Sequence, residues 1–196
     1  METNNPSRLV RGLRQAFDNK KHRAELEGAE AGFTLIELMV VLLIMAILLD
    51  IAIPTFLGVK TGAQDRSVQS NLTNGLTSAK AAYANGGTYA TTAAAEVTAL
   101  GTAEPNITFE TAAATSGSNN LSVSVATDGQ ELLLVGYSQS GQCWAAADNE
   151  GTTAAIGGAP AAAVLGVKYT NWTYSSTNTC NQTGLAAAAP TWRTAY

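Results

Sequence analysis

The side chains that could do chemistry are few and lie far apart. The single histidine, His22, lies among the first 32 residues, whereas the two cysteines, Cys143 and Cys180, lie late in the chain. A Ser/His or Cys/His nucleophile is therefore not available in residues 33–196, where no Gly-x-Ser-x-Gly occurs either. The cysteines are too far apart for a local zinc knuckle. The sequence predicts a protein that is not an enzyme and that has no metal site and no cofactor.

Glu37 stands out because of its surroundings. It lies within AGFTLIELMVVLLIMAIL, residues 31–48, which are otherwise nearly all apolar. An ionised side chain at the centre of a membrane helix costs roughly 2.5 to 3.5 kcal/mol, and less near a helix end. Glu37 is therefore either tolerated near an interface or has a partner.

The cysteines lie on the far side of the same apolar run. If that run sends the later residues out of the cytoplasm, a disulfide between Cys143 and Cys180 is favoured, with a stabilisation of roughly 4 kcal/mol. Two unrelated buried thiols are the alternative.

Other polar and aromatic clusters have ordinary explanations. Asp148-Asn149-Glu150 could touch calcium, but three polar residues in a row are usually a loop. Aromatic residues gather late in the chain, and in a small domain these usually form core, with an adhesive surface patch as the alternative. They are Trp144, Tyr169, Trp172, Tyr174, Trp192 and Tyr196.

The apolar run predicts a membrane-spanning helix over residues 33–59. A span needs about 20 apolar residues, and this segment supplies them. Residues 1–32 carry six basic and five acidic side chains and no apolar run, which is typical of a cytoplasmic leader. By the positive-inside rule the N-terminus lies in the cytoplasm and the later domain outside, so the precursor is a single-pass protein of the cytoplasmic membrane.

Polar residues with helically spaced apolar ones follow the run. Pro54 removes a backbone hydrogen bond and should kink or open the helix locally. Over residues 60–85 we expect an amphipathic continuation of the same helix, which Asn85-Gly86-Gly87 ends. The helically spaced apolar residues after Pro54 are Leu57, Val68, Leu72, Leu76, Ala79 and Tyr83.

Residues 86–196 predict a small head domain built on a sheet. Alternating or β-branched segments indicate strands, and Asp128-Gly129 is a hairpin turn signal. The segments are 107–110, 121–126, 131–137, 143–147 and 164–174, with loops at 151–163 and 185–190. The expected fold class is α+β, a long helix packed on a small antiparallel sheet. Residues 33–196 carry five basic and ten acidic side chains, which argues against a nucleic-acid site.

The junction Gly32-Phe33-Thr34-Leu35-Ile36-Glu37 resembles that of type IV prepilins. A charged leader ends in Gly32, Phe33 follows, an acid comes four residues later, and Pro54 lies near the end of the apolar run. The combination is specific, although each part alone would be weak. The resemblance covers about residues 22–85, and the later part is similar to pilins only in general layout.

The resemblance implies processing and assembly. A prepilin peptidase would cut between Gly32 and Phe33 and methylate the new amine of Phe33. The acid Glu37 would pair with the terminal amine of a neighbouring subunit, and the segment before Pro54 would lose helix in the filament. The implied partners are other copies of the chain, the peptidase, the inner-membrane assembly machinery and, before assembly, membrane lipid. Asp50 departs from the pattern, because the family usually has a small apolar residue there.

Three functions follow. The first is a structural subunit of a type IV pilus, which acts in adhesion, twitching motility or DNA uptake as an extracellular filament. The second is a pseudopilin of a type II secretion system, which the cysteine pair and the lack of an acidic calcium loop disfavour. The third is a membrane-anchored extracellular binding domain that keeps its leader and does not polymerise.

Overall fold

The computed structural model describes residues 33–114, 117–151, 156–159, 165–176 and 179–196. The expected leader, with His22 and Gly32, lies outside the described residues, as does most of the expected loop at 151–163. The chain divides into two compact units, Met1–Ile53 and Pro54–Tyr196.

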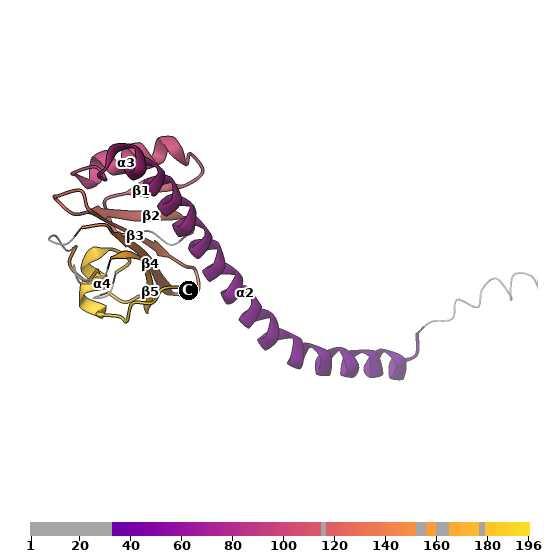
Figure 1. The fold of residues 1–196 in the computed structure, drawn as a ribbon. Helices are drawn as coiled ribbons and strands as arrows, with labels where there is room; N and C mark the ends of the chain where they lie inside the picture. The colour runs from indigo at the N-terminus through magenta and orange to yellow at the C-terminus, as the bar shows by residue number, and fades with distance from the viewer. Residues whose placement is uncertain (1–32, 115–116, 152–155, 160–164, 177–178) are drawn as a thin grey trace, which may run out of the picture. The chain divides into compact units, whose positions relative to one another are not determined.

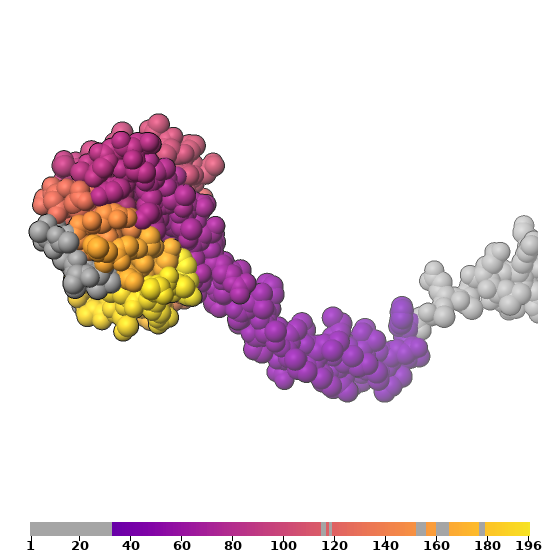
Figure 2. Space-filling model, in the orientation of Figure 1, coloured from indigo at the N-terminus to yellow at the C-terminus, as the bar shows by residue number. Residues whose placement is uncertain are grey.

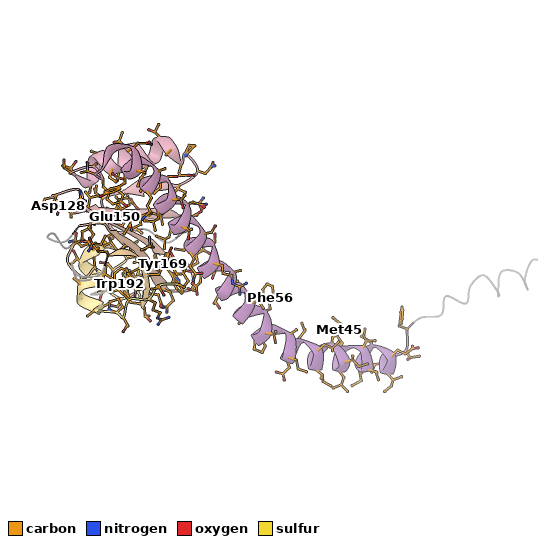
Figure 3. All side chains as sticks on the ribbon, in the orientation of Figure 1. Met45, Phe56, Asp128, Glu150, Tyr169 and Trp192 are labelled. Atoms are coloured by element: carbon orange, nitrogen blue, oxygen red, sulfur yellow. A yellow bond between two sulfur atoms is a disulfide. The ribbon has the colours of Figure 1, made fainter. Side chains whose placement is uncertain are left out.

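The first unit holds the start of helix α2 (Leu35–Gly86), which continues into the second unit. Every described residue of the first unit is exposed, including Met45, which Figure 3 labels. Side chains of this kind are expected to be covered by lipid or by other protein, because water solvates them poorly. The helix is long and apolar enough to cross a membrane.

In the second unit one face of α2 packs on the sheet. Val68, Leu72, Leu76 and Ala79 are buried at intervals of three and four residues, which is the spacing of a single helix face. The predicted amphipathic continuation is therefore confirmed. Leu57 is an exception: it is 53% exposed, since the buried part of the helix begins only at Val68.

Five strands form one sheet in the order β1-β2-β3-β4-β5 (Figure 1). Their bounds are β1 Thr108–Glu110, β2 Gly117–Val125, β3 Glu131–Tyr137, β4 Gln142–Asn149 and β5 Gly166–Thr173. Neighbouring strands run antiparallel except β1 and β2, which are parallel. The expected fold class, a long helix packed on a small and mostly antiparallel sheet, is confirmed, and the parallel pairing of β1 with β2, which follow helix α3 (Ala93–Ala103) in the chain, is the departure from it.

Both faces of the sheet are covered. On one face, side chains such as Leu132 and Leu134 pack with Leu72 of α2 and Leu100 of α3. On the other face, Leu133 and Val135 pack with α4 (Gln182–Ala188), Ile156 and the cysteines. Six of the seven residues of β3 are consequently buried, as expected for a central strand covered on both sides. In Figure 2 the C-terminal residues, in yellow, form a continuous part of the surface of this unit.

Two helices were not anticipated. The loop expected at residues 185–190 is wrong, because α4 occupies Gln182–Ala188, with the Asn181 side chain accepting a hydrogen bond from Gly184 N at its start. Helix α3 is capped in the same way by Thr92, whose hydroxyl accepts from Ala95 N. Both sequences are rich in alanine, the best helix former, and each follows a side chain that can cap a helix.

The expected turn signals are confirmed. Helix α2 ends at Gly86, and Gly87 follows with a φ of 74°. Gly129 has a φ of 69° in the turn between β2 and β3, where its N–H donates to Ala126 O. Glycine adopts such positive φ values without the steric cost that other residues carry.

Candidate functional site

The first turn of α2 is closed by two residues that bond each other in both directions. Glu37 N donates to Thr34 Oγ1 over 3.2 Å, and Thr34 N donates to Glu37 Oε2 over 2.8 Å. The Thr34 hydroxyl also donates to Glu37 Oε2, over 2.7 Å. This is a capping box, in which each side chain satisfies a backbone donor that the helix leaves free. The T-x-x-E spacing was present in the sequence, but Thr34 was not predicted to have this role.

Phe33 lies immediately before this box and is 91% exposed. The carboxylate of Glu37 is thereby held about one helical turn from the backbone nitrogen of Phe33. A groove of about 560 Å³ lies around this turn, and among the described residues that line it Glu37 is the one ionisable residue. The groove is lined by Phe33, Ile36, Glu37, Leu38, Val40 and Val41. A single fixed carboxylate in an otherwise apolar surface favours a cationic partner, because an unpaired charge there is costly.

The helix continues through Pro54 without a break. Proline has no N–H, so the carbonyl of Asp50, four residues earlier, has no helical donor opposite it. The side chain of Asp50 is exposed. The loss of helix that the resemblance implies before Pro54 is a property of the assembled state and stays a prediction.

A disulfide joins Cys143 in β4 to Cys180, just before α4. Both cysteines are fully buried in the core of the sheet face that α4 covers. Ala114 N also donates to Cys180 O over 2.9 Å, so the segment before α4 is held to the connection between β1 and β2 as well. The link fastens the last part of the chain to the middle of the sheet.

A charged network joins α2 to the end of β4. Lys80 Nζ lies 2.8 Å from Asp148 Oδ2 and 2.9 Å from Glu150 Oε1, and Tyr89 donates its hydroxyl hydrogen to Asp148. Burial by itself would lower the pKa of Lys80, but the two carboxylates together raise it. Burial, and then Asp148, raise the pKa of Tyr89. Asp148 and Asn149 were expected in a loop, and instead they end a strand and are fully buried.

Glu131 is a second fully buried acid, at the start of β3. Its pKa is raised to about 7, mainly by burial and to a smaller extent by nearby Asp128, while the hydrogen bond of 2.6 Å from Ile156 N opposes the rise. Nothing in the sequence marks Glu131 as buried, because the acid follows a turn and begins a strand. Among the described residues no group of three or more His, Cys, Asp or Glu side chains could hold a metal ion.

The late aromatic residues divide between core and surface. Trp172 is buried, whereas Tyr174 and Tyr196 are 42% and 40% exposed. Tyr174 stacks on Tyr137 with the ring centroids 4.7 Å apart, and Tyr196 packs on Tyr169 at 4.2 Å. The prediction that these aromatic residues form core is therefore right for Trp172, whereas Tyr174 and Tyr196 are partly exposed at the surface.

Residues 28–49 match the family described as the prokaryotic N-terminal methylation motif, the prepilin-type cleavage and methylation signal. Comparison with curated proteins and with solved structures gave no significant match. The matched stretch contains the Thr34–Glu37 box and most of the exposed apolar part of α2. The motif supports a type IV pilin-like or pseudopilin protein, which is structural rather than catalytic, and the apolar helix fits a membrane-anchored precursor.

Proposed function

We propose, from the prepilin-type signal at residues 28–49, that this protein is a structural subunit of a type IV pilus. A prepilin peptidase cuts the precursor between Gly32 and Phe33 and methylates the new amine of Phe33. The mature subunits then polymerise through the apolar part of α2 on the inner-membrane assembly machinery. The later part of the chain forms the outer surface of the filament.

The observation that carries this proposal is the exposed apolar surface of α2, most of which lies within the signal. Its large side chains are roughly half exposed or more, from 46% at Val40 to 75% at Leu35. Monomeric soluble proteins rarely expose an apolar surface of this extent. Lipid would cover it before assembly, and the helices of other copies would cover it in a filament.

Glu37 has a specific task in this mechanism. Cleavage creates a positive amine at Phe33 inside a bundle of apolar helices, where an unpaired charge is very costly and a paired one much less so. Thr34 binds Glu37 Oε2 and so holds the carboxylate in place before a partner arrives. The amine of an adjacent, axially shifted subunit would then complete the pair and help to set the register of the filament.

We favour a pilus over a pseudopilus because the sequence has a cysteine pair and no acidic calcium loop. The bond between Cys143 and Cys180 suits a head domain outside the cytoplasm, where disulfides persist. Recovery of the protein from sheared surface filaments of wild-type cells would support the pilus. Its restriction to the cell envelope of cells with an active secretion system would support the pseudopilus instead.

The test is mass spectrometry of the N-terminus, from whole cells and from sheared surface material. We expect a chain that begins at N-methylated Phe33 in the sheared fraction. The variant Glu37→Gln should still be cut, because the junction is unchanged, but should be lost from that fraction. An intact leader beginning at Met1, confined to the membrane, would contradict the proposal and favour an anchored binding domain.

A further inference from the structure

A groove of about 380 Å³ lies in the second unit where α2 meets the turn between β3 and β4. It is lined by Lys60, Ala63, Gln64, Ser67 and Gln139. The first four lie on one face of the helix, with successive spacings of three, one and three residues. The wall opposite is the turn residue Gln139, whose Oε1 accepts a hydrogen bond of 3.0 Å from Gln64 Nε2.

The polar atoms that this groove offers are mainly donors. Lys60 has three N–H bonds and a positive charge, Ser67 has a hydroxyl, and the Gln139 amide has two N–H bonds. Asp65, the nearest acid along the helix, accepts a hydrogen bond from Ser140. A lysine surrounded by neutral donors, with aliphatic stems beneath them, suits a phosphate ester attached to an apolar body.

The place of the groove along the chain points to the source of that phosphate. Lys60 directly follows Val59, the last residue of the apolar run, and is the first basic residue after it. About 20 helical residues cross the hydrocarbon core of a bilayer, so the residue that follows the run lies at the level of the headgroups. Lysine side chains at such positions extend toward the interface.

We propose that this groove binds the headgroup phosphate of an anionic phospholipid in the membrane that holds the subunit before assembly. The inference rests on the membrane-anchored precursor within the proposed function, and it is independent of cleavage and polymerisation. The bound headgroup fixes the depth of α2 and its rotation about its own axis. Assembly then requires release of that lipid.

The experiment uses the full chain in bilayer discs that contain phosphatidylcholine and phosphatidylglycerol in equal amounts. Native mass spectrometry after release from the disc counts the lipids that stay bound. We expect the wild type to retain one phosphatidylglycerol in preference to phosphatidylcholine. Lys60→Gln should lower that retention about tenfold or more, and Gln139→Ala about threefold, as expected for the loss of a charged and of a neutral hydrogen bond.

Arg66→Gln is the matched control. Arg66 is exposed, lies six residues from Lys60 and carries the same charge, but it does not line the groove. The Arg66→Gln variant should therefore retain phosphatidylglycerol as the wild type does. Equal losses in the Lys60 and Arg66 variants, or equal retention of the two lipids by the wild type, would overturn the proposal.

Displacement of the lipid by inorganic phosphate would show that the groove takes free phosphate, and would also overturn it. An uncut N-terminus in the mass measurement on cells would contradict the pilus function while leaving the lipid result intact. The two proposals therefore fail separately.

Discussion

Thr34 and Glu37 bond each other across the first turn of α2, with each backbone N–H donating to the side chain of the other residue. The acid that the apolar run makes conspicuous is thus also part of a helix cap. In the proposed function, this dual role would hold Glu37 in place before any neighbouring amine is present. The capping of the helix by Thr34 and Glu37 and the charge of Glu37 can therefore be tested separately.

Thr34→Ala removes the hydroxyl of the cap and keeps the charge of Glu37. We expect the first turn of α2 to lose about 1 kcal/mol of stability. Amide hydrogen exchange of residues 34–38 in detergent micelles should be roughly fivefold faster. Thr34→Ser keeps the hydroxyl and should behave as wild type, whereas equal exchange in the alanine variant would contradict the cap.

Gly136→Ala tests how closely α2 approaches β3. An added Cβ would lie 2.6 Å from Val68 Cγ1 and 2.9 Å from Leu121 Cδ2, so the variant should be less stable by about 1 to 3 kcal/mol. Thermal unfolding of the full chain in micelles, followed by near-UV circular dichroism, measures this change.

Two further variants serve as a rescue and a control for the Gly136→Ala experiment. Val68→Ala in the same chain should restore part of the loss, because it removes the nearest contact. Gly101→Ala lies in α3 with nothing within 4 Å of its added Cβ, and should raise stability by about 0.5 to 1 kcal/mol. If Gly101→Ala also lowered stability, the loss in Gly136→Ala would have to be attributed to the replacement of glycine and not to crowding against Val68 and Leu121.

Lys80→Met removes the cation from the network at the end of β4. Asp148 is fully buried and would keep only the Tyr89 hydroxyl, so the chain should lose about 1 to 3 kcal/mol. Denaturant unfolding measures the loss. Glu150→Gln, which changes only the partly exposed arm, should cost less than about 1 kcal/mol. Similar losses in both variants would contradict the central role of Asp148.

Glu131 should make the protein less stable as the pH rises. Its pKa is about 7 in the folded chain against 4.5 in a model peptide, so between these values the folded state binds more protons. Stability is then greatest below pH 4.5 and falls by about 3 kcal/mol as the pH approaches 7. Glu131→Gln should remove this fall, which urea unfolding at a series of pH values would reveal. A Glu150→Gln control should keep the slope, and an unchanged slope in Glu131→Gln would exclude a raised pKa.

Loss of the disulfide should destabilise the second unit. The link closes a loop of 37 residues, which the chain-entropy model values at about 4 kcal/mol. The double variant Cys143→Ala/Cys180→Ala, unfolded in guanidinium chloride, measures this. Wild type treated with a reductant should show a loss of similar size, since both remove the same constraint. A change below about 1 kcal/mol would indicate that α4 is held by packing alone.

Local patterns in the sequence determined the long helix, its buried stripe and most of the strands. The apolar run and the spacing of Val68, Leu72 and Leu76 are short-range signals, and a helix repeats them every turn. The prepilin-type signal is equally local, because a peptidase reads a short segment around one peptide bond. These features were therefore readable without knowledge of what packs against what.

Only the tertiary structure decided which polar residues are buried and which faces are covered. Glu131 begins a predicted strand and Asp148 was expected in a loop, and neither local pattern indicates burial. Their partners in the fold, Ile156 and Lys80, come from distant parts of the chain. The parallel pairing of β1 with β2 likewise joins residues 12 positions apart in the chain, such as Thr108 and Asn120, and no local pattern in either strand indicates its direction. The groove at Lys60 exists because Gln64 Nε2 donates to Gln139 Oε1 over 3.0 Å, although the two residues are 75 positions apart in sequence. Contacts between distant residues leave no local pattern. The sequence by itself therefore determined the helices and strands, and the folded chain decided which of them pack against one another.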